Sequence, residues 1–272
     1  MSAQFTPENL SLAGKVAIVT GSGRENGIGA AIAKAFARNG AAVMIHHVSD
    51  SSRPRAEKIV AGLRAQGAKA DLVQGDVSVP EDAAKIVNET LRLLKTDHID
   101  ILVNNAGWSH GMYKSMDATP DIVHKEFGIN VFGPLYLVQQ TIPHMPHGGR
   151  IINIGSVASK MGLDMAGIYG AAKAAQDALT YAMAMEFGKS HGVTVNTIAP
   201  GPVQTDQAQK ALGVTSQEQY EQITGAWVAS TRAAARVGTA EDIADLALLV
   251  TSEKARWLTG QFISASGGMT GL

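Results

Sequence analysis

The feature that most constrains the fold of this sequence is a regular alternation between short apolar, β-branched runs and longer segments with helical spacing. The short runs predict buried strands at residues 15–20, 41–46, 70–74, 99–104, 150–154, 193–198 and 261–264. Helical spacing predicts helices at residues 28–39, 55–66, 80–95, 121–140, 169–189 and 239–250. Alternation of this kind, with strands that are apolar along their whole length, is typical of α/β proteins. We therefore expect a doubly wound parallel sheet of about seven strands with helices on both faces.

One long segment interrupts the alternation. Residues 204–236, rich in Gln and Ala, lie between the sixth expected strand and the last expected helix. Ligands of open α/β sheets bind beyond the carboxyl ends of the strands, so an insertion at this place is expected to cover a substrate. The alternative is a helical addition that packs against another subunit. Because the chain has no Pro/Ser-rich linker, internal repeat or low-complexity tract, we expect residues 1–272 to form a single domain.

Composition argues against several classes of function. The net charge is −1 and there is no long basic or acidic run, so a nucleic-acid partner that depends on phosphate neutralisation is not expected. The sequence contains no Cys, which excludes disulfides and thiol nucleophiles. His46 and His47 are adjacent on an expected strand and so face opposite sides, which argues against a shared metal ion. We expect no metal site.

Three observations bear on location. No apolar run approaches the roughly twenty residues that span a bilayer. Residues 1–9 lack the basic and apolar regions of a secretory signal. The C-terminal residues match none of the common retention or lipidation endings. We therefore expect a cytoplasmic protein without a membrane partner.

A glycine-rich loop follows the first expected strand and leads into the first expected helix. Glycine permits a tight turn there and lets the backbone approach a pyrophosphate closely. The N-terminus of the helix adds free N–H groups and the positive end of its dipole. We therefore expect a dinucleotide cofactor, held by Gly21, Ser22, Gly23, Arg24, Gly27, Ile28 and Gly29.

The end of the second expected strand indicates which dinucleotide is bound. An acidic residue there would bind the ribose 2′-hydroxyl of NAD, whereas a cation would accept the 2′-phosphate of NADP. His47 occupies the strand end, and Arg24 and Arg53 offer guanidinium groups nearby. Since Arg pairs well with phosphate, we expect NADP(H) in preference to NAD(H). Asp50 keeps NAD open as an alternative, because its loop could bring the carboxylate to the ribose.

Tyr169, Lys173 and Ser156 form a candidate proton-transfer group. Tyr169 and Lys173 are four residues apart in an expected helix, so their side chains project from the same face. A neighbouring ammonium favours phenolate and would lower the phenol pKa from its usual value of about 10. Tyr169 would then act as an acid or base near neutral pH, while the Ser156 hydroxyl, thirteen residues upstream, would anchor a substrate oxygen.

Further motifs follow in a set order along the chain. They are Asp76-Val77, Asn104-Asn105-Ala106-Gly107, Asn130, Pro200-Gly201-Pro202-Val203 with Thr205, and Gly267-Gly268. Together with the glycine loop and the Ser, Tyr and Lys residues, this set resembles the short-chain dehydrogenase/reductase family over nearly the whole chain. The resemblance implies a single Rossmann-type domain and redox chemistry with a nicotinamide cofactor.

The resemblance also implies a role for each motif. Tyr169 would be the general acid for carbonyl reduction or the base in the reverse direction, and Lys173 would lower its pKa and hold the nicotinamide ribose. Ser156 would polarise the carbonyl, and Asn130 would help to hold a water relay behind Lys173. Asp76 and Val77 would contact the adenine ring, and the cofactor groove would be lined by Asn105, Ala106 and Gly107. The nicotinamide and its carboxamide would be contacted by Pro200, Gly201, Val203 and Thr205.

The glycine loop departs from the family pattern. That pattern has three residues between its first two glycines, whereas five residues separate Gly21 from Gly27. Either the loop carries a two-residue insertion, or Gly23 is the first glycine of the family pattern and Ser22 replaces the Thr that usually precedes it. The departure leaves the phosphate contacts of Ser22, Gly23 and Arg24 open.

The residues expected to contact substrate are Ser156, Trp108, Tyr169 and Gly201. Trp108 would form a wall for an aromatic or polycyclic substrate, or would instead serve in packing. Met161 and Met165 are expected to fill core or interface space. Family members commonly form tetramers through the Tyr169 helix, whose small-residue face includes Ala172 and Met183. We therefore expect a homo-oligomer, a tetramer or a dimer.

The resulting hypothesis is an NADPH-dependent carbonyl reductase that acts on a ketone, with a cyclic or aromatic ketone as the favoured small-molecule substrate. An NAD-dependent secondary-alcohol dehydrogenase is the alternative of the same class. A non-redox member of the fold, acting as an isomerase, a cyclisation scaffold or a binding protein, is the alternative of another class. The presence of Asn130, Ser156, Tyr169 and Lys173 favours redox activity.

Overall fold

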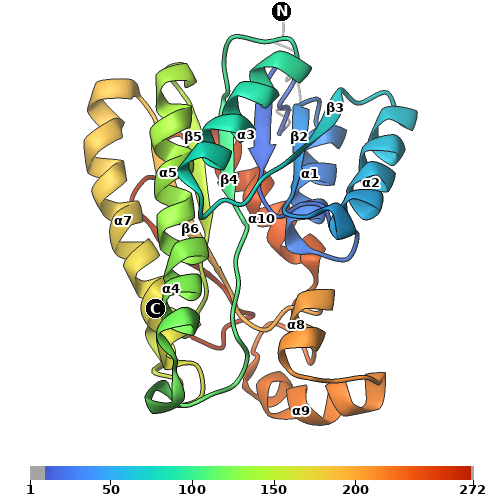
Figure 1. The fold of residues 1–272 in the computed structure, drawn as a ribbon, viewed down its shortest axis with the longest axis vertical. Helices are drawn as coiled ribbons and strands as arrows, with labels where there is room; N and C mark the ends of the chain where they lie inside the picture. The colour runs from blue at the N-terminus through green and yellow to red at the C-terminus, as the bar shows by residue number, and fades with distance from the viewer. Residues whose placement is uncertain (1–9, 271–272) are drawn as a thin grey trace, which may run out of the picture.

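The computed structural model describes residues 10–270, which form a central parallel sheet with helices on both faces (Figure 1). The sheet has seven strands in the order β3-β2-β1-β4-β5-β6-β7, and every neighbouring pair is parallel. The strands are β1 (Val16–Val19), β2 (Ala42–His47), β3 (Ala70–Gln74), β4 (Ile101–Asn104), β5 (Arg150–Ile154), β6 (Thr194–Pro200) and β7 (Phe262–Ala265). The predicted doubly wound α/β fold is therefore confirmed. The residues on which no secretory signal was expected, 1–9, lie outside the described part.

Ten α-helices accompany the strands within residues 10–270. They are α1 (Ile28–Arg38), α2 (Arg53–Ala65), α3 (Pro80–Leu93), α4 (Pro120–Phe127), α5 (Gly133–Thr141), α6 (Ala158–Met161), α7 (Gly167–His191), α8 (Asp206–Ala211), α9 (Gln217–Ser230) and α10 (Ala240–Thr251). The helix expected at residues 239–250 begins with a capping box between Thr239 and Asp242. None of the helices in the described part is long and apolar enough to cross a bilayer.

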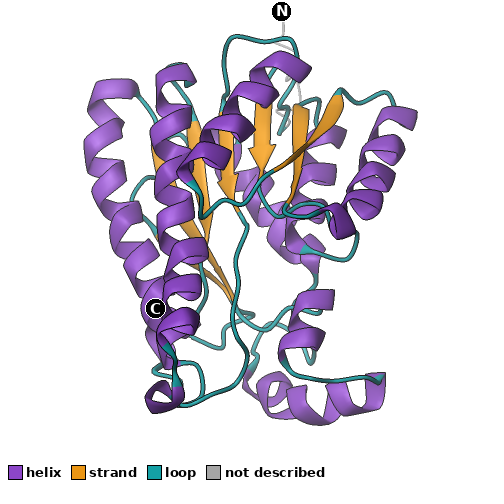
Figure 2. Cartoon of the chain, viewed as in Figure 1, coloured by secondary structure: helices purple, strands orange, loops and turns teal. Residues whose placement is uncertain are grey.

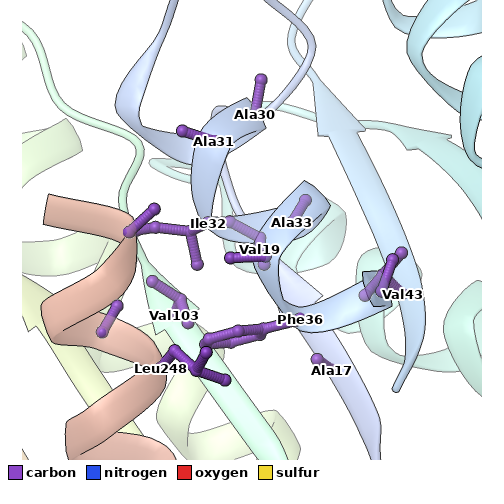
Figure 3. Close-up of a cluster of buried hydrophobic side chains, with 14 of the residues drawn as sticks. Ala17, Val19, Ala30, Ala31, Ile32, Ala33, Phe36, Val43, Val103 and Leu248 are labelled. Atoms are coloured by element: carbon purple, nitrogen blue, oxygen red, sulfur yellow. The ribbon is translucent and has the colours of Figure 1, made fainter. Parts of the chain in front are cut away.

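Two hydrophobic cores cover the two faces of the sheet. Side chains alternate along a strand, so Ala17 and Val19 of β1 face one core, while Val16 and Ile18 face the other. Figure 3 shows the first core, where Ile32 and Phe36 of α1 pack with Leu248 of α10 over β1. The second core receives residues from α3, α5 and α7. Burial on both faces is the reason that the central strands β1 and β4 are almost entirely apolar.

The helix expected at residues 121–140 is present, and it contains one irregular turn. A π-helical segment, Gly128–Phe132, separates α4 from α5. Gly133 follows this segment and packs directly on Val77, where an added Cβ would lie 2.9 Å from Val77 Cγ2. This close approach fixes the position of the chain next to the π-helical turn. Asn130 lies within the π-helical segment, a kind of irregularity that often accompanies functional sites.

The small-residue face of α7 does not provide the subunit contact that was suggested for it. Ala172 is fully buried within the same chain, and Met183 is nearly so and packs in the second core. The outward side of α7 instead exposes Tyr181 and Met185. The expectation of a homo-oligomer therefore rests on other residues of this helix than those named from the sequence.

Candidate active site

The loops that follow the strands gather at the carboxyl edge of the sheet, the lower edge in Figure 2, with α8 and α9 beyond it (Figures 1 and 2). A cavity of about 720 Å³ lies at this edge, lined by the glycine loop, the ends of β2, β5 and β6, and residues of α8 and α9. This volume is within the range of small-molecule and cofactor sites. The predicted site residues on its wall are Gly21, Gly23, Arg24, Gly27, Ile28, His47, Asp76, Val77, Asn105, Ala106, Gly107, Trp108, Ser156, Tyr169, Lys173, Pro200, Gly201, Val203 and Thr205.

The glycine loop packs tightly against the turn that follows β4. Gly21 has φ = +63°, and a Cβ added there would lie 2.9 Å from Ala106 Cα. A Cβ added to Gly29 would overlap the Asn105 side-chain amide and the carbonyl of Gly21. Gly27 immediately precedes α1 and has no side chain to cap its first N–H groups. The loop therefore has both properties that a pyrophosphate site needs, a backbone free of Cβ atoms and a helix N-terminus.

Ser22 and Gly29 are not on the cavity wall. Ser22 is fully buried, its hydroxyl donates to Val19 O at 2.6 Å, and it accepts the backbone N–H of His46 at 3.0 Å. The side chain therefore points into the protein and is not available to a phosphate. The first residue with left-handed backbone after β1 is Gly21, two residues beyond the strand. The added residues close a turn in which Gly27 N donates to Arg24 O at 3.0 Å. This geometry favours the two-residue insertion over a shifted register.

His46 is a structural residue of the site whose role the sequence did not reveal. Its Nδ1 accepts the Gly21 N–H at 2.9 Å, so the neutral ring donates from Nε2 to Gly75 O at 2.9 Å. Burial lowers the pKa of His46 to about 4, which keeps the ring neutral at ordinary pH. A neutral imidazole thus links the glycine loop, β2 and the end of β3. The only signal in the sequence was its place at the end of a strand.

Two Arg residues, Arg24 and Arg55, line the cavity near the end of β2. Arg53, which was expected there, is exposed, pairs with Glu57 at 2.8 Å, and is not among the residues that line the cavity. Residues two apart on a helix point to nearly opposite sides, so Arg55 faces the cavity when Arg53 faces away. Ser49, Ser51 and Ser52 line the same end. Of the two Arg residues named from the sequence, Arg24 lines the cavity and Arg53 does not.

The first turn of α8 contacts the glycine loop and α2. Asp206 accepts from Arg55 Nη2 at 2.5 Å and from Asn26 Nδ2 at 3.3 Å. Gln207 donates to Gly107 O at 3.0 Å and accepts from Arg24 Nη1 at 3.5 Å. Polar contacts thus connect the 204–236 segment to the glycine loop and α2 on one side of the cavity and to Gly107 on the other.

Ser156, Tyr169 and Lys173 meet on one wall of the cavity. Ser156 lies two residues after β5, and Tyr169 and Lys173 occupy successive turns at the start of α7. Burial raises the pKa of Tyr169; a hydrogen bond with Ser156 lowers it, and the charge of Glu126 raises it further. The phenol therefore holds its proton at neutral pH.

Lys173 does not act on Tyr169 in the expected way. Its Nζ lies 5.9 Å from the centre of the Tyr169 ring and donates to Ile154 O at 2.8 Å and Gln176 Oε1 at 3.2 Å. The ammonium is thus directed at these acceptors, and the expectation that it lowers the pKa of Tyr169 is not met in the structure. Burial lowers the pKa of Lys173 itself to about 8, while the charge of Asp177 opposes this shift.

Asn130 is fully buried behind the cavity wall. Its side chain donates to Trp108 O at 2.7 Å and to Glu126 O at 2.8 Å, and its Oδ1 accepts the Trp108 N–H at 3.3 Å. A Cβ added to Gly107 would lie 3.1 Å from Asn130 Oδ1 and 3.7 Å from Lys173 Nζ. Asn130 therefore orders the backbone at Trp108 and lies in the neighbourhood of Lys173.

The outer part of the cavity is apolar and aromatic. Its wall includes Trp108, Met112, Met161, Leu163, Met165, Leu212, Tyr220 and Trp227. The face of the Trp108 ring carries Lys125 Nζ at 4.5 Å, and the ring makes an edge contact with His110. Met161 and Met165, which were expected to fill core or interface space, are thus on the cavity wall.

Comparison with known proteins places the chain among dehydrogenases and reductases. A family model described as enoyl-(acyl carrier protein) reductase matches residues 21–270. A short-chain dehydrogenase/reductase, FrzI of Cladobotryum, is 37% identical over 95% of this chain and 97% of its own. Versicolorin reductase 1 of Aspergillus parasiticus is 36% identical over 96% and 98%. The crystal structure of a Burkholderia cenocepacia short-chain dehydrogenase in complex with NADP superimposes with a TM-score of 0.83, at 32% identity over 95% and 98% of the two chains.

Proposed function

Since the chain belongs to the short-chain dehydrogenase/reductase family, we propose that it is an NADPH-dependent carbonyl reductase in which Tyr169 donates the proton to a ketone. The observation that carries the proposal is the single cavity, whose wall combines the glycine loop with Ser156, Tyr169 and Lys173. One end offers the features of a dinucleotide site and the other an apolar space with an acid at its base. Reduction of a carbonyl needs both.

The mechanism assigns one step to each polar side chain. NADPH, when held by the glycine loop and the other residues of the cavity wall, would supply the hydride for the carbonyl carbon. Ser156 donates a hydrogen bond to the carbonyl oxygen and so stabilises the negative charge that develops there. Tyr169 then transfers its phenolic proton to that oxygen. Its raised pKa suits this direction, because the side chain enters the reaction protonated. Lys173, one turn later on α7, would use the ammonium N–H left over by Ile154 O and Gln176 Oε1 to hold the nicotinamide ribose.

The proposed cofactor is NADP(H), and the crystal structure of the Burkholderia cenocepacia relative, which is bound to NADP, supports this choice. Arg55 and the three nearby serines provide a cation and hydroxyl donors for a 2′-phosphate. Arg55 pairs with Asp206 and also lies 3.6 Å from Glu25, so a phosphate would compete with carboxylates for it. Asp50, the residue that favoured NAD, is exposed in a short 3₁₀ turn and is not among the cavity-lining residues of the described part.

Arg55→Ala is expected to weaken NADPH binding by about 10- to 100-fold, because a charge-assisted hydrogen bond to the phosphate is lost. NADH binding should stay nearly unchanged, since NADH has no 2′-phosphate. Both affinities can be measured by fluorescence titration. Arg53→Ala is the matched control, as this Arg lies on the same helix but faces Glu57, and it should retain the NADPH affinity. Equal losses for NADPH and NADH in Arg55→Ala would reject the assignment of Arg55.

For the substrate we propose a cyclic or aromatic ketone. The apolar wall formed by Trp108, Tyr220 and Trp227 supports this class, since aromatic side chains offer flat surfaces for ring stacking. A relative from Pestalotiopsis fici is named as a tetrahydroxynaphthalene reductase, and naphthalene is a fused aromatic ring system. We also propose that residues 204–236 cover the substrate, because α8 and α9 contribute to the same wall.

The direct experiment incubates the purified protein with NADPH and a panel of ketones that runs from linear aliphatic to fused bicyclic aromatic. NADPH oxidation and alcohol formation are measured together. The proposal expects the highest kcat/KM for the cyclic aromatic members, and a lower kcat/KM with NADH in place of NADPH. Alcohol oxidation with NAD as the preferred reaction would instead support the dehydrogenase alternative.

We further propose that the protein is a homo-oligomer. Tyr181 and Met185 on α7 and Phe132 next to α5 expose apolar side chains that suit a subunit contact. Light scattering of the purified protein measures the mass of the particle in solution, which should be a multiple of the mass of one chain.

A further inference from the structure

Gln176 is a buried amide that the mechanism above does not use. It lies on α7 one turn after Lys173, and only 1% of its surface is exposed. Its Oε1 accepts a hydrogen bond from Lys173 Nζ at 3.2 Å. Its Nε2 is buried and has no hydrogen-bond partner within residues 10–270. One end of the amide therefore contacts a residue of the active site, and the other end is left unpaired.

The orientation of this amide follows from the chemistry of its neighbour. An ammonium group has three donors and no acceptor, so only the amide oxygen can face Lys173. The NH₂ group is then forced to point away, into a place that offers it no acceptor. An unpaired buried donor destabilises a fold, and an apolar side chain of the same length would avoid that cost. A purely structural role therefore favours a residue such as Met at this position.

Lys173 depends on acceptors because it is almost fully buried. Its Nζ donates to Ile154 O and to Gln176 Oε1, and Lys173 also lines the cavity. These two acceptors use two of the three ammonium N–H groups, and one remains for the cavity. Removal of either acceptor would weaken the charged form and free the Nζ to move.

Several charged or titratable groups surround Lys173. Asp177 on α7 favours the ammonium, and Lys160 of α6 lies 3.4 Å from Asp177 and offsets part of its charge. Tyr169 is one turn earlier on α7, and Glu126 of α4 acts on Tyr169. Gln176 is the neutral acceptor in this group, and it contacts Nζ directly.

We propose that Gln176 is a positioning residue for the reductase reaction, whose amide oxygen holds the Lys173 ammonium charged and in place on the wall of the active site. The inference rests on the proposed function for its catalytic meaning, but the contact itself can be tested without turnover. Gln176 touches neither the reacting atoms nor the cavity and acts through Lys173.

The test titrates Lys173 in the intact protein by lysine-selective ¹³C NMR, with the signal assigned by its loss in Lys173→Met. Gln176→Met removes the acceptor at nearly constant length, and Gln176→Glu replaces it with a carboxylate. The titration of Lys173 in the wild type is expected near pH 8. It should move to lower pH in Gln176→Met and to higher pH in Gln176→Glu. The control is Thr180→Val, buried one turn later on the same helix and without a hydrogen bond to Lys173 in the described structure, which should leave the titration in place.

Two further readouts separate positioning from structure. The pH above which kcat declines should be lowest in Gln176→Met and highest in Gln176→Glu, as for the Lys173 titration. Above the Lys173 titration, Gln176→Met should therefore be about three- to tenfold less active than the wild type. The Tm of Gln176→Met should stay close to that of the wild type, because removal of the unpaired amide offsets the loss of one acceptor for Lys173. A lower Tm with an unchanged Lys173 titration would overturn the proposal. If the wild type reduces no ketone, the proposed function fails, and the NMR titration still decides whether Gln176 controls Lys173.

Discussion

Tyr169→Phe is expected to lower kcat for ketone reduction by about 10²- to 10⁴-fold, the usual contribution of a positioned general acid. The substitution removes the phenolic oxygen and keeps the ring, so the half-buried packing at the start of α7 is preserved. The raised pKa of Tyr169 means that the wild-type side chain starts the reaction with a proton to give. The measurement is single-turnover NADPH oxidation with the best ketone of the panel.

NADPH affinity is the control for this variant. The cofactor end of the cavity is built from the glycine loop and from Arg55 with its neighbouring serines, none of which Tyr169→Phe changes. Binding of NADPH should therefore remain close to wild type while chemistry is lost. A variant that binds NADPH and still reduces the ketone at the wild-type rate would show that the proton comes from another group.

Ser156→Ala is expected to lower kcat by about 10²- to 10³-fold, the cost of removing one hydrogen-bond donor from a developing oxyanion. Ser156 lies beside Tyr169 and its hydrogen bond lowers the phenol pKa, so the Ala variant also makes Tyr169 a weaker acid. Both effects act on the chemical step. The measurement is again single-turnover reduction, with the KM of the ketone recorded alongside.

The double variant Ser156→Ala with Tyr169→Phe distinguishes this account from independent roles. If Ser156 and Tyr169 act on the same oxygen, the double variant should be little worse than Tyr169→Phe alone. Fully additive losses would indicate separate roles for the two residues. Ser159→Ala is a suitable control, because Ser159 is close in the chain but its hydroxyl interacts with Asp177 and the Ser156 backbone.

The sheet could be predicted closely from the sequence because its strands are buried on both faces. β3 and β5 begin and end at the predicted residues, since each is a compact run bounded by helix or turn signals. The π-helical turn at Gly128–Phe132 could not be predicted, because glycine is tolerated within helical patterns. The contact that fixes Gly133 involves Val77, more than fifty residues earlier in the chain, and no local pattern reports it.

The sequence predicted which motifs form the site, but not the directions in which several of their side chains point. Motif spacing located Ser156, Tyr169 and Lys173, but not the direction of the Lys173 ammonium, which is set by the carbonyl of Ile154. The choice of Arg53 over Arg55 failed because the start of α2 determines which Arg faces the cavity. Ser22 was assigned to the phosphate by its place in the loop, yet its hydroxyl satisfies backbone groups of β1 and β2.

The central claim is hydride transfer from NADPH to a carbonyl carbon, and isotope transfer tests it most directly. The protein is incubated with a cyclic aromatic ketone and NADPH that carries deuterium at the transferable position of the nicotinamide, and the product is analysed by NMR and mass spectrometry. The account predicts an alcohol with one deuterium on its carbinol carbon. An unreduced ketone, or deuterium on a carbon of an adjacent double bond in the manner of an enoyl reductase, would contradict it.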